Sequence, residues 1–130
     1  MVTEALELMQ SSEVLCRQVW GMDDDIEIVA ILNKKGRIEE MIARDDGVNK
    51  DLTSNKREML FMEFVLLASM NKEYDNEFGK ANGLIIHREK VLLFSFQLQD
   101  HVMVVITKPL FDPTVVQQRI VELIRNHVEA

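Results

Sequence analysis

Three histidines are the first side chains of this 130-residue sequence to consider for metal chemistry. His87 and His101 fall in segments that could become neighbouring strands, whereas His127 stands alone near the end of the chain. A usual zinc site needs three or four ligands, and no cysteine cluster or paired histidine motif completes such a set. We therefore expect no metal ion and no cofactor.

The sequence gives as little evidence for acid/base or nucleophilic catalysis as for a metal site. The pairs Glu39-Glu40 and Asp45-Asp46 are adjacent residues in or beside an expected hairpin, where acidic pairs ordinarily form solvated surface. Ser95 lacks the strand-turn-helix context of an activated serine, and the scattered glycines make no phosphate-binding loop. The sequence predicts no catalytic residue, so we expect a protein that is not an enzyme.

The composition predicts one acidic domain spanning residues 1–130. Hydrophobic residues make up 47% of the chain, which is enough for a core, and 15 basic against 22 acidic residues give a net charge of −7. That charge repels phosphate backbones and anionic lipids, so neither nucleic acid nor a membrane is expected as a partner. The chain shows neither a signal-peptide pattern nor an apolar run of about 20 residues, and a single cysteine, Cys16, suits a reducing compartment. These features favour a cytoplasmic location, with Cys16 as a small buried hydrophobe.

The elements that would position these side chains can be read from the spacing of apolar residues. Helical spacing and capping residues predict three helices: residues 4–19, a long helix from about residue 55 to Gly79, and a last helix opening at Asp112-Pro113. Extended patterns between turns predict five strands: residues 26–32, 37–43, 81–87, 90–98 and 101–108. Residues 44–55 read as a polar loop that ends in Thr53, Ser54 and Asn55, any of which could cap the long helix.

The resulting order is α-β-β-α-β-β-β-α. Residues 102–106 (VMVVI) are apolar at both alternating sets of positions, as expected of a central strand that is covered above and below. We expect an α/β (α+β) protein with a three-layer α/β/α sandwich around a five-stranded, mainly antiparallel sheet. The long helix would cover one face of the sheet and the two terminal helices the other.

The long helix contains the most apolar segment of the chain, MLFMEFVLLASM at residues 59–70, where only Glu63 and Ser69 are polar. At 100° per residue, Leu60, Phe64 and Leu67 form one side that continues through Tyr74 and Phe78. A second apolar side is formed by residues spaced three, four and four apart: Met59, Met62, Leu66 and Met70.

A helix with two apolar sides needs two covers. The protein's own sheet can supply one, and the other comes from further helices or from a partner chain, unless the loop at residues 44–52 covers that side. The loop is polar, so we favour a partner and predict that Met59, Met62, Leu66 and Met70 form a dimer interface, where methionine adapts to irregular surfaces.

The order of elements, with a long second helix over a two-strand plus three-strand sheet, resembles the roadblock/longin group of the profilin-like folds. Three segments, LCRQVWGMDDDIEIVAILNKKGRI, REMLFMEFVLLASMNKEYDNEFG and HREKVLLFSFQLQDHVMVVITKP, are similar to an uncharacterised family of small archaeal proteins with no assigned activity. The chain departs from that family at residues 40–43 (EMIA), where its members tend to carry a Gly-Gly pair.

The roadblock resemblance implies a non-enzymatic, dimerising scaffold or adaptor that binds another protein, often a small GTPase or a signalling component. In that group, sheet edges and second helices commonly meet across a twofold axis. The profilin-like resemblance also implies an alternative, a PAS-like domain that senses a small molecule held between sheet and helix. Five aromatic residues are candidates for such a pocket: Phe94 and Phe96 on one strand and Phe61, Phe64 and Tyr74 on the helix.

Overall fold

The computed structural model describes residues 12–110 and 112–128. The first helix is described over residues 12–20, so residues 4–11 of the helix predicted there lie outside the described part. The strands are β1 (Ile26–Leu32), β2 (Ile38–Ala43), β3 (Leu84–His87), β4 (Leu92–Gln97) and β5 (Val102–Thr107). The further helices are α2 (Val48–Asp51), α3 (Ser54–Lys72), α4 (Asp75–Phe78) and α5 (Pro113–Val128).

The five strands form one antiparallel sheet in the order β2-β1-β5-β4-β3. Every residue of the central strand β5 is buried, and so is every residue of its neighbour β1. The prediction that residues 102–106 form a central, doubly covered strand is confirmed. Strands β2 and β3 are the two edges, and β2 runs without interruption through residues 40–43, so no special turn forms there.

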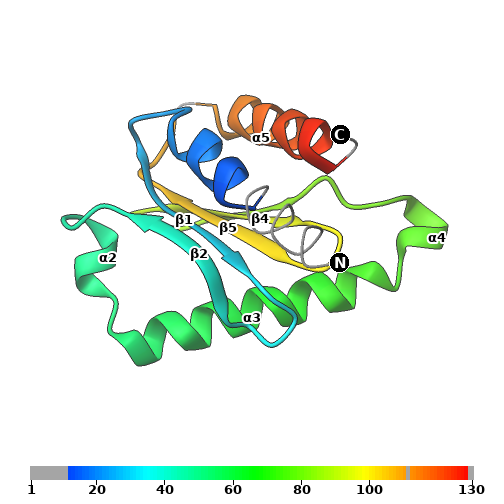
Figure 1. The fold of residues 1–130 in the computed structure, drawn as a ribbon, viewed down its shortest axis with the longest axis horizontal. Coiled ribbons are helices and arrows are strands. Elements are labelled where there is room, and N and C mark those ends of the chain that lie inside the picture. The colour runs from blue at the N-terminus through cyan, green and yellow to red at the C-terminus, as the bar shows by residue number, and fades with distance from the viewer. Residues whose placement is uncertain (1–11, 111, 129–130) are drawn as a thin grey trace, which may run out of the picture.

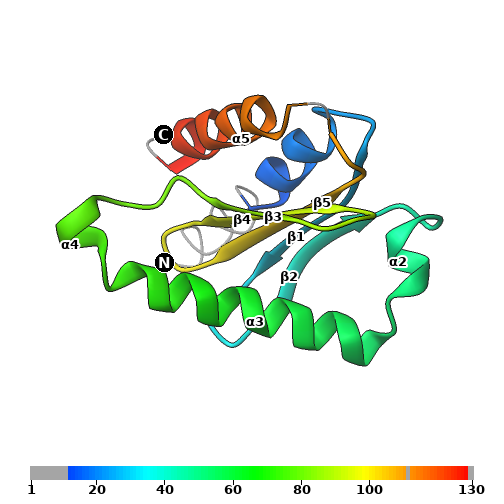
Figure 2. The ribbon, with the colours of Figure 1, turned by 180° about the vertical axis from the view of Figure 1, so that it is seen from behind.

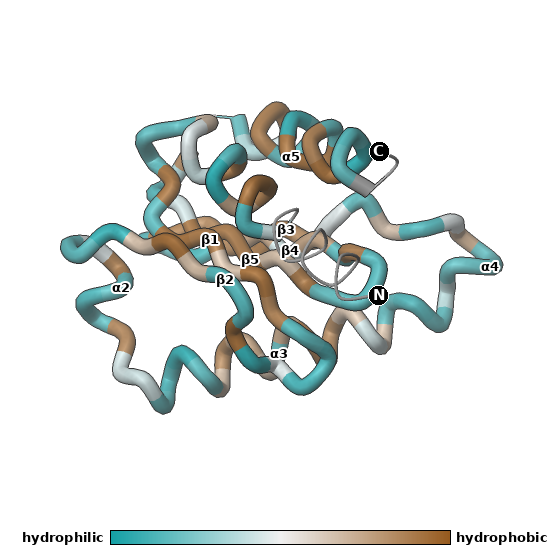
Figure 3. The backbone as a smooth tube through the Cα atoms, viewed as in Figure 1, coloured by the Kyte–Doolittle hydropathy of each residue, from teal (hydrophilic) through white to brown (hydrophobic). Residues whose placement is uncertain are grey.

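Helices cover both faces of this sheet (Figures 1 and 2). α3 lies across one face, where Phe61 and Phe64 pack against Ile28, Val104 and Ile106 of the central strands. The N-terminal helix and α5 lie on the other face and contribute buried apolar residues there: Leu15, Cys16, Val19, Val116 and Ile120. Hydrophobic segments are concentrated in the strands between the two layers (Figure 3). The predicted three-layer α/β/α sandwich is confirmed.

The prediction of one long helix up to Gly79 is wrong, because two helices occupy that segment. α3 ends at Lys72 and α4 begins at Asp75. Between them, the N–H of Tyr74 bonds to the Asn71 carbonyl at 3.2 Å, three residues back, and Tyr74 leaves the helical region with φ −103° and ψ 8°. The predicted stop at Gly79 is confirmed by its positive φ of 79°.

Asparagine supplies a physical reason for this break. The Asn71 side chain donates a hydrogen bond to the Leu67 carbonyl at 3.0 Å, which is the competition with backbone bonding that makes asparagine favour helix ends and turns. Apolar periodicity alone does not reveal such a bond, so the predicted helix extended past residue 72 to Gly79.

The polar loop predicted before α3 contains the short helix α2. A buried acidic residue of β1 holds its start: Glu27 Oε2 accepts a hydrogen bond from the Val48 N–H at 2.7 Å. Gly47 has a φ of 82°, and a Cβ on it would lie 2.5 Å from the same oxygen. Of the three predicted caps, Thr53 is the one that caps α3, because its hydroxyl accepts from the Lys56 N–H at 3.2 Å.

Candidate functional site

The outer face of α3 carries an open row of large apolar side chains, the α3 seam, defined as Met59, Met62, Leu66 and Met70. Their exposed fractions are 65%, 40%, 55% and 62%, respectively. On the opposite side of the helix, Phe61 and Phe64 are buried against the sheet. The seam and the side that packs on the sheet therefore lie on opposite sides of α3, as the helical spacing predicts.

Several side chains of the predicted sheet side lie elsewhere. Leu60 and Leu67 are both half-buried and line a groove at the side of the helix, and Leu60 also packs on the buried cluster beneath α3. Tyr74 and Phe78 follow the break in the helix and are exposed, so their predicted place on the sheet side is wrong. Phe61, considered for a ligand pocket, lies in the core on that side instead.

The loop at residues 44–52 does not cover the seam. Val48 and Leu52 turn inward and pack against the apolar cluster between α3 and the sheet. Met62 lies next to the β1–β2 turn, where a Cβ added to Gly36 would lie 2.9 Å from Met62 Cε. The seam thus stays open with the loop in place, which removes the alternative that the loop hides it.

A groove of about 450 Å³ runs beside the seam, between α3 and the edge formed by β3 and its turn. We call it the α3–β3 groove. Its walls are mainly apolar and come from α2, α3, β3 and the central strands: Val48, Leu52, Met59, Leu60, Phe64, Leu67, Ile86, Val91, Leu93 and Ile106. Lys56, Glu63 and Arg88 supply its charges. Met59 belongs to both the seam and the groove, so the two features form one continuous surface.

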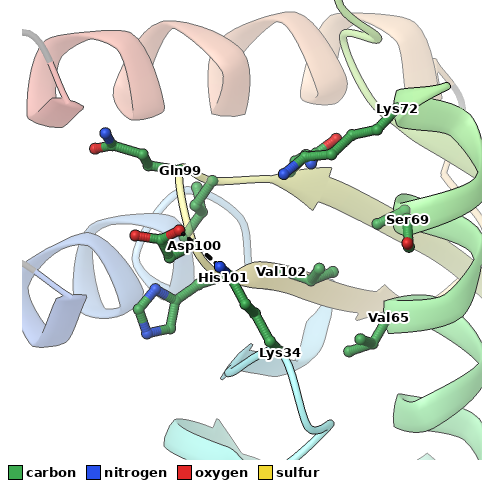
Figure 4. A pocket seen from close by; sticks show the side chains of 11 residues that line it. Lys34, Val65, Ser69, Lys72, Gln99, Asp100, His101 and Val102 are labelled. Carbon is green, nitrogen blue, oxygen red and sulfur yellow. Dashed lines mark ion pairs between the residues drawn. The ribbon is translucent and has the colours of Figure 1, made fainter. Parts of the chain in front are cut away.

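A second, smaller pocket of about 220 Å³ lies at the other end of α3 (Figure 4). It is bounded by Val65, Ser69 and Lys72 of α3 and by the β4–β5 turn. Across the turn, Lys34 Nζ forms an ion pair with Asp100 Oδ1 at 3.3 Å between exposed side chains. Exposed pairs of this kind contribute little to stability, and the pocket shows an ordinary solvated surface rather than a converging set of reactive groups.

The structure separates the histidines. His87 pairs with Leu92 at one end of β4, while His101 follows β4 at the other end, beyond Gln97. Gln97 lies five positions, or about 17 Å, along the strand from Leu92. Because β4 also lies between β3 and β5, the expectation that the two histidines fall on neighbouring strands is wrong. His101 Nε2 instead contacts Glu39 Oε2 at 2.8 Å, and His127 Nε2 contacts Gln18 Oε1 at 2.8 Å.

Of the acidic pairs and the serine, Glu39 is the residue already described in contact with a histidine, His101. Glu39, Asp45 and Asp46 are exposed, as expected of solvated surface, while Ser95 is buried in the middle of β4. Within residues 12–110 and 112–128, no group of three or more His, Cys, Asp or Glu residues is placed to hold a metal ion.

The aromatic residues proposed for a sensing pocket do not share one. Phe94 and Phe96 stack with their centroids 6.2 Å apart and lie in the core beneath the N-terminal helix and α5. Phe61 and Phe64 lie on the opposite face of the sheet. The sheet separates the two pairs, so the predicted pocket between them is wrong.

Two features of the surface were missed by sequence reasoning. The α3–β3 groove depends on the packing of distant segments, which apolar periodicity does not reveal. The second is the exposed ring pair Tyr74–Phe78, whose centroids lie 6.1 Å apart. Its exposure follows from the break between α3 and α4, which the sequence did not predict. Among the described residues, no helix is both long and apolar enough to cross a membrane.

Solved structures share this architecture. MglB of Myxococcus xanthus superimposes with a TM-score of 0.67 at 14% identity, over 93% of this chain and 87% of its own. A roadblock/LC7 domain from Streptomyces avermitilis superimposes with a TM-score of 0.63 at 13% identity, covering 91% of this chain and 98% of its own. The gliding protein MglB from Thermus thermophilus superimposes with a TM-score of 0.65 at 9% identity, over 93% of this chain and 90% of its own.

Protein-family models and curated proteins gave no match to this sequence. At such low identities, the structural likeness concerns the fold. Together with the observed element order and sheet topology, it shows that this chain has the fold of roadblock/LC7 domain proteins.

Proposed function

We propose that the protein is a non-enzymatic scaffold that forms a homodimer through the α3 seam and binds another protein. The observation that carries this proposal is the row of four large apolar side chains exposed on the outer face of a helix whose inner face is already packed. Contiguous apolar surface of this kind is typical of protein interfaces. The roadblock/LC7 fold supports the same interpretation, and one structure of that fold is described as "MglB with tetrameric arrangement".

The class of the further partner rests on the roadblock resemblance, which implies a small GTPase or a signalling protein. The net charge of −7 argues against nucleic acid and anionic membranes as direct partners. A reducing, cytoplasmic location suits the single, buried thiol of Cys16. The archaeal resemblance adds no biochemical partner to this proposal.

Charge substitutions in the seam test the dimer. Leu66→Glu should give a folded monomer, because association would place a carboxylate against an apolar partner surface. Val115→Glu is the matched control, since Val115 is also an exposed apolar helix residue, at 48%, but lies on α5. Light scattering reports the mass of each variant, and circular dichroism checks its fold. A dimer of unchanged affinity in Leu66→Glu would contradict the proposed interface.

A third variant tests which side of α3 faces the sheet. Phe64→Glu should prevent folding of the monomer itself, because this ring is buried between α3 and the central strands. A folded Phe64→Glu protein together with an unfolded Leu66→Glu protein would reverse the orientation of the helix.

A pull-down from the native cell extract tests the adaptor role. Wild-type protein and the Leu66→Glu monomer serve as parallel baits. We expect the wild type to retain another protein from the extract. If that protein is a GTPase, the eluate should also contain guanine nucleotide. Discovery of an enzymatic activity that disappears in His87→Ala or His101→Ala would contradict the non-enzymatic role.

A further inference from the structure

The floor of the α3–β3 groove is an apolar row that crosses three neighbouring strands. Ile86 of β3 pairs with Leu93 of β4, which in turn pairs with Ile106 of β5, and all three side chains line the groove. The ring of Phe64 on α3, which is 1% exposed, lines it as well. An occupant of the groove therefore meets a closely packed layer of apolar side chains between α3 and the sheet.

Both cations of the groove lie at the same end. Lys56 is in the first turn of α3, and Arg88 follows β3 in a turn closed by a hydrogen bond from its N–H to the Val91 carbonyl at 3.0 Å. Figure 2 shows the start of α3 and α2 together at one end of the sheet. The ion pairs formed among residues 12–110 and 112–128 involve neither Lys56 nor Arg88. Glu63, which also lines the groove, lies two helical turns, or about 10 Å, farther along α3, so an anion at the basic end stays clear of it.

The size of the groove argues against a helix as its occupant. The α3 residues that line it run from Lys56 to Leu67, or about 16 Å along the helix axis. A second helix, about 10 Å in diameter, would take up about 1,250 Å³ over that length. The groove holds about 450 Å³, which lies within the range of about 300–1,000 Å³ that is typical of small-molecule sites.

The apolar floor also disfavours an extended peptide. A peptide backbone laid over the side chains of Ile86, Leu93 and Ile106 would leave N–H and C=O groups without hydrogen-bond partners, at a cost in free energy. An alkyl chain carries no such groups and gains free energy for each CH₂ that it removes from water.

We infer that the α3–β3 groove binds a single-chain amphiphile with a carboxylate head group, of the fatty-acid class. The alkyl chain lies along Leu60 and Leu67 over the apolar floor. Lys56 and Arg88 hold the head group, and a guanidinium such as that of Arg88 matches a carboxylate with two parallel hydrogen bonds. A single negative charge suits a protein of net charge −7, which repels more highly charged head groups. This ligand site goes beyond the proposed scaffold and does not require the dimer.

Calorimetric titration of the wild-type protein tests the class of ligand. Octanoate, decanoate and dodecanoate are titrated below their micellar concentrations, and each added CH₂ should tighten the dissociation constant about two- to fourfold, because the open groove removes part or all of it from water. Dodecyltrimethylammonium has a dodecyl chain with a cationic head group and should bind at least about fivefold more weakly than dodecanoate. Equal binding of octanoate and dodecanoate, or of dodecanoate and the cationic amphiphile, would overturn the inference.

Substitutions in the groove test the location of the site. Lys56→Gln and Arg88→Gln should each weaken dodecanoate binding about two- to fivefold. Lys90→Gln is the matched control, because Lys90 is exposed in the same turn as Arg88 but does not line the groove. Leu67→Trp fills the groove with a larger side chain and should abolish binding, whereas Val115→Trp on α5 should leave it unchanged. Circular dichroism checks each fold, and dodecanoate binding that survives in folded Leu67→Trp protein would overturn the inference.

The mass of the same wild-type samples separates this inference from the proposed dimer. A dimer by light scattering that binds no dodecanoate overturns the groove site and leaves the dimer standing. A monomer that binds dodecanoate contradicts the dimer and supports the groove site.

Discussion

At the scale of single residues, Cys16 shows how the fold changes the chemistry of a side chain. Its thiol is 1% exposed and its Sγ contacts the Val29 carbonyl at 3.7 Å. Burial, and secondarily the negative charge of Glu40, raise the pKa of Cys16 from 9.0 to about 11. The thiol therefore stays neutral at neutral pH, as expected of a small buried hydrophobe rather than a nucleophile.

This pKa shift predicts a dependence of stability on pH. Between pH 9.0 and about 11 the unfolded chain releases the Cys16 proton while the folded chain keeps it, so the stabilisation is complete below pH 9.0 and is lost as the pH rises through the folded pKa. Up to about pH 10.5 the loss should amount to about 2 kcal/mol. Urea denaturation at about pH 8 and about pH 10.5 measures it. Cys16→Ala should lack this part of the decline, and an equal decline in both proteins would contradict the assignment.

Glu27 is a second residue whose role appears only in the folded protein. Its sequence signal is a lone acid in the apolar run IEIVAIL, and in the structure its carboxylate accepts the Val48 N–H at the start of α2. Glu27→Ala should cost about 1–3 kcal/mol of unfolding free energy, because that N–H loses its acceptor. Glu58→Ala, an exposed acid on α3, should change stability by less than about 0.5 kcal/mol. Equal effects in the two variants, measured by denaturant titration, would exclude the capping role.

At the scale of elements, the strongly patterned segments were predictable and the interruptions were not. The strand at residues 26–32 was predictable because the segment is rich in β-branched and apolar residues, and the strand at residues 102–106 because it is apolar on both alternating sets. Asp112-Pro113 marked the start of α5. The split of the long helix and the short α2 depend on individual hydrogen bonds of Asn71 and Glu27. Such bonds involve one side chain each and leave little trace in a periodic pattern.

Capping of α3 provides a prediction for a single element. Thr53→Ala should lower the unfolding free energy by about 1 kcal/mol, because the Lys56 N–H loses the hydroxyl that accepts its hydrogen bond. Ser54→Ala is the neighbouring control, since Ser54 lies inside the helix and alanine favours helix. Thermal unfolding measures the stability of the two variants and shows which substitution lowers it more. A larger loss in Ser54→Ala than in Thr53→Ala would contradict the assigned cap.

At the scale of the whole molecule, the candidate interface was predictable in part. The seam of Met59, Met62, Leu66 and Met70 followed from helical spacing, and its exposure agrees with that spacing. The α3–β3 groove could not be predicted, because its walls come from four parts of the chain that meet only after folding. The sensing pocket failed for a related reason, since residue spacing does not say which face of the sheet an aromatic ring occupies.

The balance of forces between two copies favours an interface made by apolar contact. Each chain carries a net charge of −7, so two copies repel each other at long range. The exposed side chains of the α3 seam can offset this repulsion by removing apolar area from water. Association would therefore depend on the seam.

The mass of the wild-type protein in solution tests this central claim most directly. Light scattering at about micromolar concentration, where a dimer of ordinary affinity persists, should give twice the chain mass of 15.1 kDa. The prediction follows from the open seam on α3. A mass of one chain that does not change as the concentration is raised would contradict the account.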